Sequence, residues 1–350
     1  MKKVVLLFCL FFMLTLMSTA QDEDATLTLL THDSFNVSED VLNTFQEETG
    51  ITVEILRGGD TGQMLNQAIL TKDNLPADIM FGVDNTFLGR ALDEELFIPY
   101  MTPLLESIDG QFIIDESFSV TPITYGDVCL NYDVAYFEEE NLPLPESLTD
   151  LTDPAYNELL VVQNPASSSP GLAFLLATVA EFGTPDDDDN EYTYLDFWRD
   201  LMDNGTRVVD GWSTAYYGEF TAASEDGFYP MVVSYASSPP FTVNEEGTAA
   251  STRSIVADNM CFRQVEFAGI LRGTERESEA QQFIDFMLGE AFQSDVPDQM
   301  YVFPVATDTE LPELFAEFAA LPDNPATLTP QAINAGRDTW IEAWLELIRQ

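Results

Sequence analysis

The stretch TLTLLTHDSFNVSEDVLNTFQEETGITVEILRGGD, residues 26–60, decides the fold class. Its first segment, 26–35, alternates apolar and polar residues as a half-buried strand does, and ends in small polar residues. A helix is predicted next, because Ser38 is a favourable N-cap and Gly50 a favourable stop. A second strand follows and runs into a glycine-rich turn. Strand, helix and strand in this order predict an α/β sheet that is largely parallel.

The alternation continues to residue 97 and returns in the middle of the chain. Residues 77–85, ADIMFGVDN, form a third predicted strand of the first set. In the middle, ELLVVQNP (158–165) and YPMVVSYASSPP (229–240) are predicted strands, and SPGLAFLLATVAEFG (169–183) is a predicted helix. Two longer β segments, 124–133 and 261–271, separate the sets. They predict two α/β lobes joined by crossing strands, with residues 21–125 plus about 262–350 in lobe 1 and 126–261 in lobe 2.

The first twenty residues, MKKVVLLFCLFFMLTLMSTA, have the pattern of a secretory signal peptide. Lys2 and Lys3 precede an apolar run, and Ser18-Thr19-Ala20 supplies a small-x-small cleavage site. An uncleaved membrane anchor is the alternative, but the run is short for a membrane span. We therefore expect a periplasmic or extracellular protein, cleaved after Ala20.

Composition limits the partners. The chain has 61 acidic and 13 basic residues and a net charge of −48. Such a surface repels nucleic acid and anionic membranes, so neither is an expected partner. The charge could steer cations, although adaptation to the habitat is the simpler cause. Removing 20 of the 350 residues leaves 330, a length typical of two domains, and we expect a monomer.

Two cysteines, Cys129 and Cys261, remain after removal of the signal segment. An even number of cysteines in an exported protein predicts a disulfide, with two buried free thiols as the alternative. Both cysteines lie on the predicted crossing segments.

The sequence lacks the usual motifs of catalysis. His32 is its one histidine, and no G-x-S-x-G elbow, P-loop or dinucleotide fingerprint is present. One histidine without a cysteine cluster cannot form a usual zinc site, so His32 is interpreted as structural or as a polar group at a cleft edge. We predict a protein that is not an enzyme and has no cofactor or resident metal. A secreted carbohydrate-active enzyme with a carboxylate pair remains the alternative outside the binding proteins.

Polar residues gather where the predicted strands end, and in open α/β sheets ligands bind at these ends. The motifs there, in order, are THDSF (31–35), GGDTGQMLN (58–66), ADIMFGVDN (77–85), YGDVCLNYD (125–133), NPASSSPGL (164–172), GWSTAY (211–216), VVSYASSPP (232–240) and YVFPVA (301–306). Their order and spacing resemble the periplasmic thiamine-binding proteins of ABC importers over nearly the whole mature chain. The resemblance implies the type II periplasmic-binding-protein fold, in which each lobe is a mostly parallel sheet flanked by helices, and two crossing strands join the lobes.

The resemblance also implies a ligand, thiamine or a thiamine phosphate, and a membrane permease as the partner. The binding residues that it implies are Asp60, Thr61, Ser168, Ser169, Trp212, Tyr235, Ala236, Ser237 and Ser238. This sequence departs from the family pattern at two positions. Thr61 replaces a glycine, and on the crossing strand the carboxylate has moved to Asp127.

Physical chemistry supports a cationic ligand. Aromatic faces attract a thiazolium ring, and Asp60, Asp84 and Asp127 are candidate anionic partners. Ser168 and Ser169 precede a helix, whose N-terminus favours an anion such as a phosphate. Trp212 is therefore assigned to the ligand, whereas Tyr216 and Tyr217 are interpreted as mainly structural. Tandem tyrosines also occur in ferric-ion-binding proteins, so iron or another small cation is the alternative ligand.

Overall fold

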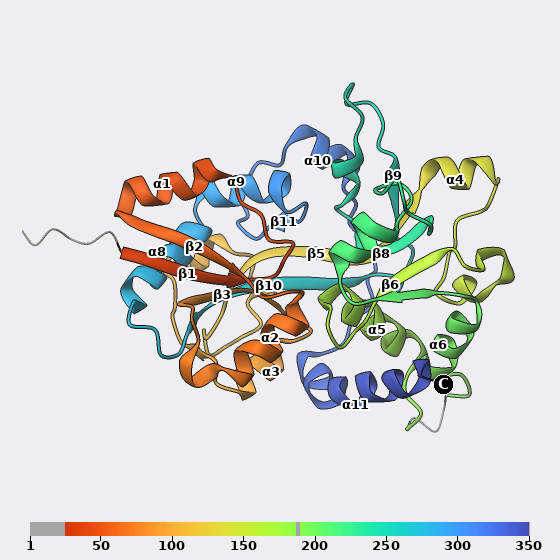
Figure 1. Cartoon of the computed structure of the whole chain (residues 1–350), viewed down its shortest axis with the longest axis horizontal. Helices are drawn as coiled ribbons and strands as arrows, with labels where there is room; N and C mark the ends of the chain where they lie inside the picture. The colour runs from red at the N-terminus through yellow and green to blue at the C-terminus, as the bar shows by residue number, and fades with distance from the viewer. Residues whose placement is uncertain (1–24, 187–189, 350) are drawn as a thin grey trace, which may run out of the picture.

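A computed structural model describes residues 25–186 and 190–349 (Figure 1). The predicted signal peptide lies outside the described residues. Within the described ranges, one 11-stranded sheet has the order β2-β1-β3-β10-β5-β8-β6-β7 along its main path. Helices cover both faces of this sheet, so the predicted α/β class is confirmed.

The N-terminal block, β1 to α3, forms one end of the sheet. Its strands are β1 (Ala25–Thr31), β2 (Ile51–Arg57) and β3 (Ile79–Asp84), and its helices are α1 (Glu39–Thr49), α2 (Thr61–Leu70) and α3 (Leu88–Asp93). The strands β2 and β3 both pair with β1 in parallel. Helix α1 begins and ends as its sequence predicts: the Ser38 hydroxyl accepts a hydrogen bond from the Val41 N–H, and Gly50 is left-handed with φ 75°.

The middle block, β6 to β8, forms the other end. It contains β6 (Leu160–Gln163), β7 (Arg207–Val209) and β8 (Met231–Tyr235), with α5 (Ser169–Phe182) and α6 (Tyr194–Asp203) packed beside them. The strands β7 and β8 both pair with β6 in parallel. Helix α5 is buried along its first eleven residues, which explains why its sequence is apolar on all sides.

Two long strands connect the blocks, as predicted. They are β5 (Thr121–Asp133) and β10 (Phe262–Leu271), which pair with each other antiparallel. On one side, β10 pairs with β3 and with the short β4 (Phe97–Ile98), and β11 (Phe303–Pro304) pairs with the first part of β5. On the other side, the last part of β5 pairs with β8 and with β9 (Thr252–Ile255). The two parallel sheets are thus continuous through the crossing strands.

The predicted disulfide between Cys129 and Cys261 is present on these crossing strands. The two Cα atoms are 4.3 Å apart, and both side chains are fully buried. Its two ends are 132 residues apart in the sequence. The bridge therefore fixes the start of β10 to the centre of β5.

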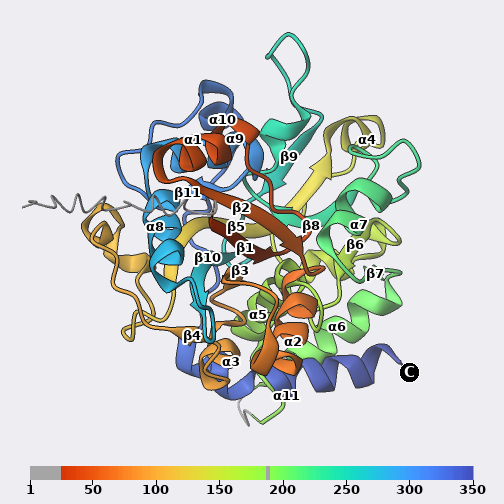
Figure 2. The ribbon, with the colours of Figure 1, turned by 60° about the vertical axis from the view of Figure 1, so that its left-hand side comes forward.

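The chain returns to both blocks after β10. Helices α8 (Glu277–Met287) and α9 (Glu290–Gln299) pack beside the N-terminal block, and α10 (Glu313–Phe318) packs against the turn at 239–242. The last helix, α11 (Pro330–Ile348), contacts both α3 and α6, so it spans the two blocks (Figures 1 and 2). The short α4 (Val134–Glu139) follows β5.

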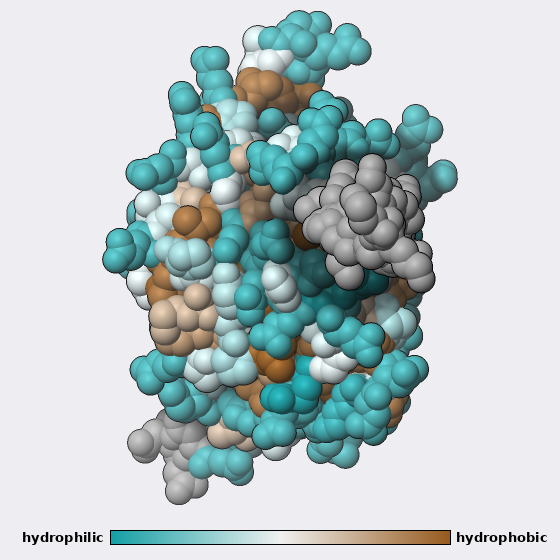
Figure 3. All heavy atoms as spheres, turned by 90° about the vertical axis from the view of Figure 1, so that its left-hand side faces the viewer, coloured by the Kyte–Doolittle hydropathy of each residue, from teal (hydrophilic) through white to brown (hydrophobic). Residues whose placement is uncertain are grey.

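The molecular surface agrees with the charge of the sequence. The face at the α1 and α8 end is predominantly hydrophilic, with apolar residues scattered in small groups (Figure 3). Among the described residues, no helix has both the length and the apolar character to span a membrane.

Candidate ligand-binding site

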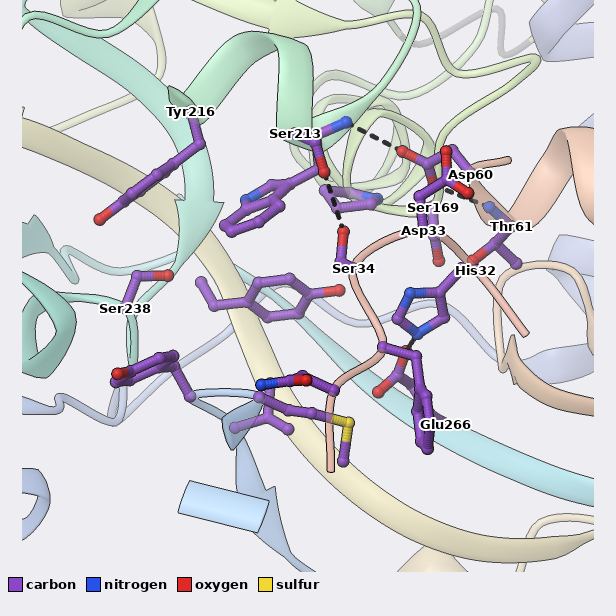
Figure 4. A pocket seen from close by; sticks show the side chains of 18 of the residues that line it. His32, Asp33, Ser34, Asp60, Thr61, Ser169, Ser213, Tyr216, Ser238 and Glu266 are labelled. Carbon is purple, nitrogen blue, oxygen red and sulfur yellow. Dashed lines mark hydrogen bonds and ion pairs between the residues drawn. The ribbon is translucent and has the colours of Figure 1, made fainter. Parts of the chain in front are cut away.

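A cavity of about 440 Å³ lies where the N-terminal and middle blocks face each other (Figure 4). Its wall comes from the ends of β1, β2 and β8, from the segment around residue 212, and from residues 298–302. The predicted polar strand ends therefore meet, as the sequence suggested. Of the eleven predicted binding residues, six line the cavity: Asp60, Thr61, Ser169, Trp212, Tyr235 and Ser238.

Aromatic rings make much of the wall. They are Phe35, Trp212, Tyr216, Tyr217, Tyr235, Phe241 and Tyr301. The Trp212 ring stacks on Tyr216, with centroids 4.9 Å apart and an interplanar angle of 20°, and meets Tyr217 edge-on at 5.4 Å. The indole Nε1–H donates a hydrogen bond of 2.9 Å to the Ser234 hydroxyl, which fixes the orientation of the ring.

Both tandem tyrosines line the cavity, although the sequence suggested a mainly structural role for them. Tyr216 is buried, and burial raises the pKa of its hydroxyl above the ordinary value. Tyr217 is 44% exposed. The pair belongs to a short helical segment, α7 (Trp212–Thr214) followed by a π-helical turn at Ala215–Glu219. One turn of chain thus places three rings on one side of the cavity.

Asp60 joins the two blocks at the cavity edge. As the N-cap of α2, it accepts the Thr61 N–H at 2.8 Å on Oδ1, and it accepts the Trp212 N–H at 2.9 Å on Oδ2. Burial raises the pKa of Asp60, and the two N–H donors oppose this effect without cancelling it. The carboxylate is therefore held by donors from both blocks (Figure 4).

Further contacts join the blocks beside Asp60. The Gly62 N–H donates to the Ser167 carbonyl oxygen at 3.0 Å, and the hydroxyls of Ser34 and Ser213 are 3.3 Å apart. A Cβ atom at Gly62 would lie 2.9 Å from the Ala166 and Ser167 backbone, so this close approach requires glycine. The two blocks touch along this edge, and the cavity lies behind it.

His32 lies in the cavity wall beside Glu266. Its Nε2 is 3.2 Å from Glu266 Oε1, and the Thr124 hydroxyl donates to Glu266 Oε2 at 2.7 Å. Burial alone would lower the pKa of His32, but Glu266 and Asp60 raise it above the ordinary value. Burial likewise opposes ionisation of Glu266, yet His32 and Thr124 bring its pKa below the ordinary value. The pair is an ion pair when His32 is protonated.

Carboxylates exceed cations in the cavity wall. The lining acids are Asp33, Asp60, Glu266 and Asp298, and the lining bases are Arg57 and His32. Arg57 Nη1 donates to the Phe35 and Asp33 carbonyl oxygens at 2.7 and 3.0 Å, so it also holds the loop after β1 in place. Aromatic faces together with excess negative charge suit an organic cation.

Five of the predicted residues do not line the cavity, and two of them are carboxylates. Asp127 is buried and forms a two-point ion pair with Arg263, at 3.1 Å to Nε and 2.8 Å to Nη2. Asp84 is also buried and accepts hydrogen bonds from Thr86, Ser169 and other donors. Burial raises the pKa of Asp84 to about 6. The donors that these two acids accept from are protein groups.

Of the two serines at the start of α5, only one lines the cavity. Ser169 lines the cavity, while its hydroxyl donates to Asp84 and accepts from the Gln264 amide at 2.6 Å. Ser168 is the N-cap of α5, but its buried hydroxyl makes no capping bond, and it lies close enough to Asp60 to lower the pKa of that carboxyl. The helix N-terminus therefore lies next to the cavity, with only Ser169 in its wall.

In the segment 235–238, likewise, only some of the residues line the cavity. Ala236 and Ser237 are fully buried, and Ala236 packs against the disulfide. Tyr235 and Ser238 line the cavity, and the Ser238 hydroxyl is 3.0 Å from that of Ser234. The chain turns after β8, where the Ser238 N–H donates to the Tyr235 carbonyl oxygen at 3.0 Å, so the first and last residues of the segment face the cavity and the two between them face the core.

Sequence reasoning did not select several lining residues. Glu266 lies within a crossing strand, where period-two alternation alone does not show which side faces a ligand. Arg57 is one residue before the glycine-rich turn, and Asp298 and Tyr301 lie at the end of α9 and just after it. The YVFPVA motif, 301–306, was the available signal for this last segment.

Comparison with known proteins identifies the family. Residues 74–322 match the family model described as "Bacterial extracellular solute-binding protein". The chain belongs to this family. This membership confirms the prediction of an exported solute-binding protein that is not an enzyme.

Relatives cover the chain almost completely. The "Thiamine-binding periplasmic protein" of Brucella suis is 31% identical over 97% of both chains, and the protein of the same name from Escherichia coli is 28% identical over 91% of this chain and 92% of its own. A solved "Periplasmic thiamin binding protein" has a TM-score of 0.79 and 26% identity, over 92% of this chain and 96% of that chain. Iron-bound HitA from Pseudomonas aeruginosa shares the fold, with a TM-score of 0.73 and 23% identity over 92% and 99%. The predicted two-lobe binding-protein fold is thereby confirmed.

Proposed function

We propose that this solute-binding protein captures thiamine or a thiamine phosphate in the cavity and delivers it to the permease of an ABC importer. The main observation behind the proposal is the composition of the cavity wall, which contains seven aromatic rings, four carboxylates and one arginine. The curated relatives named as thiamine-binding proteins support the same ligand.

Thiamine matches this wall chemically. It carries a permanent thiazolium charge and a flat aminopyrimidine ring. Each well-placed ring contributes about 0.5–2 kcal/mol to the binding of such a cation, depending on its desolvation. The volume of about 440 Å³ lies within the usual range of small-molecule sites. We assign ligand contacts to the six predicted residues that line the cavity, with Trp212 as the main stacking surface.

The remaining predicted residues receive a supporting role in this proposal. Asp84 orients Ser169, and Asp127 holds Arg263 on the neighbouring strand. Ala236 and Ser237 fix the segment that carries Tyr235. Ser168 is the residue that we place next to a phosphate group, because its hydroxyl makes no capping bond and the N-terminus of α5 favours an anion.

The lobes of the proposal keep the predicted boundaries. Lobe 1 comprises residues 21–125 plus about 262–350, and lobe 2 comprises 126–261. The pairing of β5 agrees with a division near residue 125, since Thr124 and Tyr125 pair with β11 whereas residues 128–133 pair with β8 and β9. Thiamine contacting both lobes would stabilise the closed arrangement.

Ferric ion is the second candidate, because the tandem tyrosines do line the cavity. Trp212 stacks over the Tyr216 ring, however, and this arrangement favours a flat organic ligand. In the described part of the chain, no group of three or more His, Cys, Asp or Glu side chains could hold a metal ion.

Calorimetric titration of ligand-stripped protein tests the proposal. Thiamine and thiamine monophosphate should each bind saturably at one site, and ferric citrate should give no comparable heat. If ferric citrate binds and neither thiamine nor its phosphates give a binding heat, the iron alternative would be favoured. Turnover of a glycan would favour an enzyme.

A further inference from the structure

A second, smaller cavity of about 190 Å³ lies between α3 and the N-terminal part of α11. Figures 1 and 2 show the two helices side by side, and the described lining of this cavity shares no residue with that of the ligand cavity. Its wall contains two arginines, Arg90 and Arg337, and three amide side chains, Asn85, Gln331 and Asn334. None of its described lining residues is an aspartate or a glutamate. In a chain with 61 acidic and 13 basic residues, such a wall is unexpected.

Arg337 has an incomplete set of partners. Its side chain is buried, with the residue 5% exposed, and it forms an ion pair with Asp338, whose Oδ1 accepts from Nε at 3.1 Å and from Nη2 at 2.5 Å. The guanidinium lies 5.4 Å from the centre of the Phe87 ring. Its Nη1 is buried and has no hydrogen-bond partner among the described residues. A buried N–H of a charged group is destabilising when it lacks an acceptor, so this atom marks a position for one.

Among the described residues, Arg90 has no ion-pair partner within contact distance, unlike Arg337, which pairs with Asp338. Glu94, one turn later on the chain, is engaged by Lys72 at 2.7 Å, and Asp93 accepts a long hydrogen bond from Asn334 at 3.4 Å. Burial lowers the pKa of Arg337 and the positive charge of Arg90 acts in the same direction, whereas Asp338 and Asp84 act in the opposite direction without cancelling the effect of burial. The two cations therefore raise the local potential together.

We propose that this cavity binds a compact inorganic anion, a halide or a tetrahedral oxyanion, between Arg90 and Arg337. Arginine guanidinium groups are strong donors to such anions. The Asn85 and Asn334 amides already donate to the Arg263 carbonyl oxygen and to Asp93, so the two arginines are the main donors. The volume admits an ion of this size with water and is less than half that of the ligand cavity.

Acidic groups limit the size of the occupant. A neighbouring cavity shares Arg90 and Arg337, but Asp93, Glu94, Asp338 and Glu342 also line it. A larger anion would extend toward these carboxylates and be repelled. The acid-free side between α3 and α11 is therefore the part that fits an anion.

The position of the site gives the anion a structural consequence. Helix α11 contacts α3 near its start and α6 near its end, where the Tyr194 hydroxyl donates to the Trp340 carbonyl oxygen at 3.3 Å. The two helices approach closely at Gly89, where a Cβ atom would lie 2.2 Å from Asn334 Oδ1. An anion held by both arginines links α3 to the helix that reaches the middle block.

Chloride-35 NMR line broadening tests the site directly. The full mature protein should broaden the chloride signal saturably, and sulfate or phosphate should remove the broadening where an oxyanion is the preferred occupant. Arg90→Gln should weaken anion binding at least about tenfold, since a charged hydrogen-bond donor is lost. Arg199→Gln is the matched control, because it removes the same charge from an exposed position on α6.

Two comparisons make the test decisive. Broadening that is absent in the wild-type protein, or equal in Arg90→Gln and Arg199→Gln, would overturn the proposal. Saturating thiamine should leave the broadening unchanged, because the ligand cavity is separate; loss of the signal with thiamine would place the anion beside Arg57 instead. Arg90 is half-buried rather than buried, so its replacement tests the site without removing Arg337 from the core.

Discussion

Replacing Asp60 by asparagine should weaken thiamine binding by opening the contact between the two blocks. The carboxylate accepts the Thr61 N–H and the Trp212 N–H on different oxygens, at 2.8 and 2.9 Å. An asparagine side chain has one acceptor oxygen, so one of these hydrogen bonds is lost. Charge-assisted hydrogen bonds contribute about 1.5–3 kcal/mol, and the partial exposure of Asp60 reduces this to about 1–2 kcal/mol.

That free energy sets the expected change in affinity. A loss of about 1–2 kcal/mol from the closed arrangement corresponds to about a five- to thirtyfold rise in the apparent Kd for thiamine. Calorimetric titration of the wild-type and variant proteins measures it. Small-angle scattering of the ligand-free Asp60→Asn protein should also show a larger radius of gyration, because the blocks separate more readily.

Asp298→Asn is the matched control for charge. Asp298 also lines the cavity but is exposed, and none of its described side-chain atoms bonds across to the middle block. Its replacement removes the same charge and should change the Kd less than about threefold. An equal loss of affinity in both variants would mean that Asp60 acts only through its charge. An unchanged Kd in Asp60→Asn would refute the role of this hydrogen bond in closure.

Three further substitutions test the role of Trp212, the disulfide and the buried Asp84. Trp212→Ala should abolish most of the thiamine-dependent fluorescence quenching and weaken binding by about 2 kcal/mol or more, whereas Trp340→Phe, remote from the cavity, should alter neither. Replacing Cys129 and Cys261 together by alanine should lower the free energy of unfolding in urea by about 5 kcal/mol, because the bridge closes a long loop; an unchanged unfolding midpoint would contradict this. Burial raises the pKa of Asp84 to about 6, so the stability that its carboxyl contributes is full below about pH 4 and lost as the pH rises through 6. The free energy of unfolding of Asp84→Asn, measured by urea denaturation, should therefore rise by up to about 3 kcal/mol relative to that of the wild type between pH 4 and 7. A difference between the two proteins that stays constant with pH would refute the raised pKa of Asp84.

Local sequence signals predicted the fold well because each is a short-range effect. Ser38 and Gly50 define the ends of α1 through their own backbone geometry, and the apolar run of 169–183 needs only burial to become α5. The pairing of the crossing strands is a long-range property. That the parallel strands of both blocks join one continuous sheet through β5 and β10 is visible only in the structure.

The cavity that we propose as the binding site lies at the strand ends where the sequence suggested a cleft, but the sequence did not predict which side chains line it. Asp60 and Asp127 both looked like ligand carboxylates, yet Asp127 faces Arg263 across the β5–β10 pairing. The sequence could not show this, because the choice depends on which residue of a distant strand lies opposite. Glu266 was missed for the same reason, since its approach to His32 depends on the pairing of β10 with β3, the strand next to β1.

Native mass spectrometry of the protein, purified without denaturation from cells supplied with thiamine, tests the central claim most directly. A retained ligand reports its own mass, so no choice of candidate precedes the measurement. We expect one bound molecule with the mass of thiamine or a thiamine phosphate, lost when Trp212 is replaced by alanine. A retained ferric ion, or a ligand-free protein that takes up no added thiamine, would contradict it.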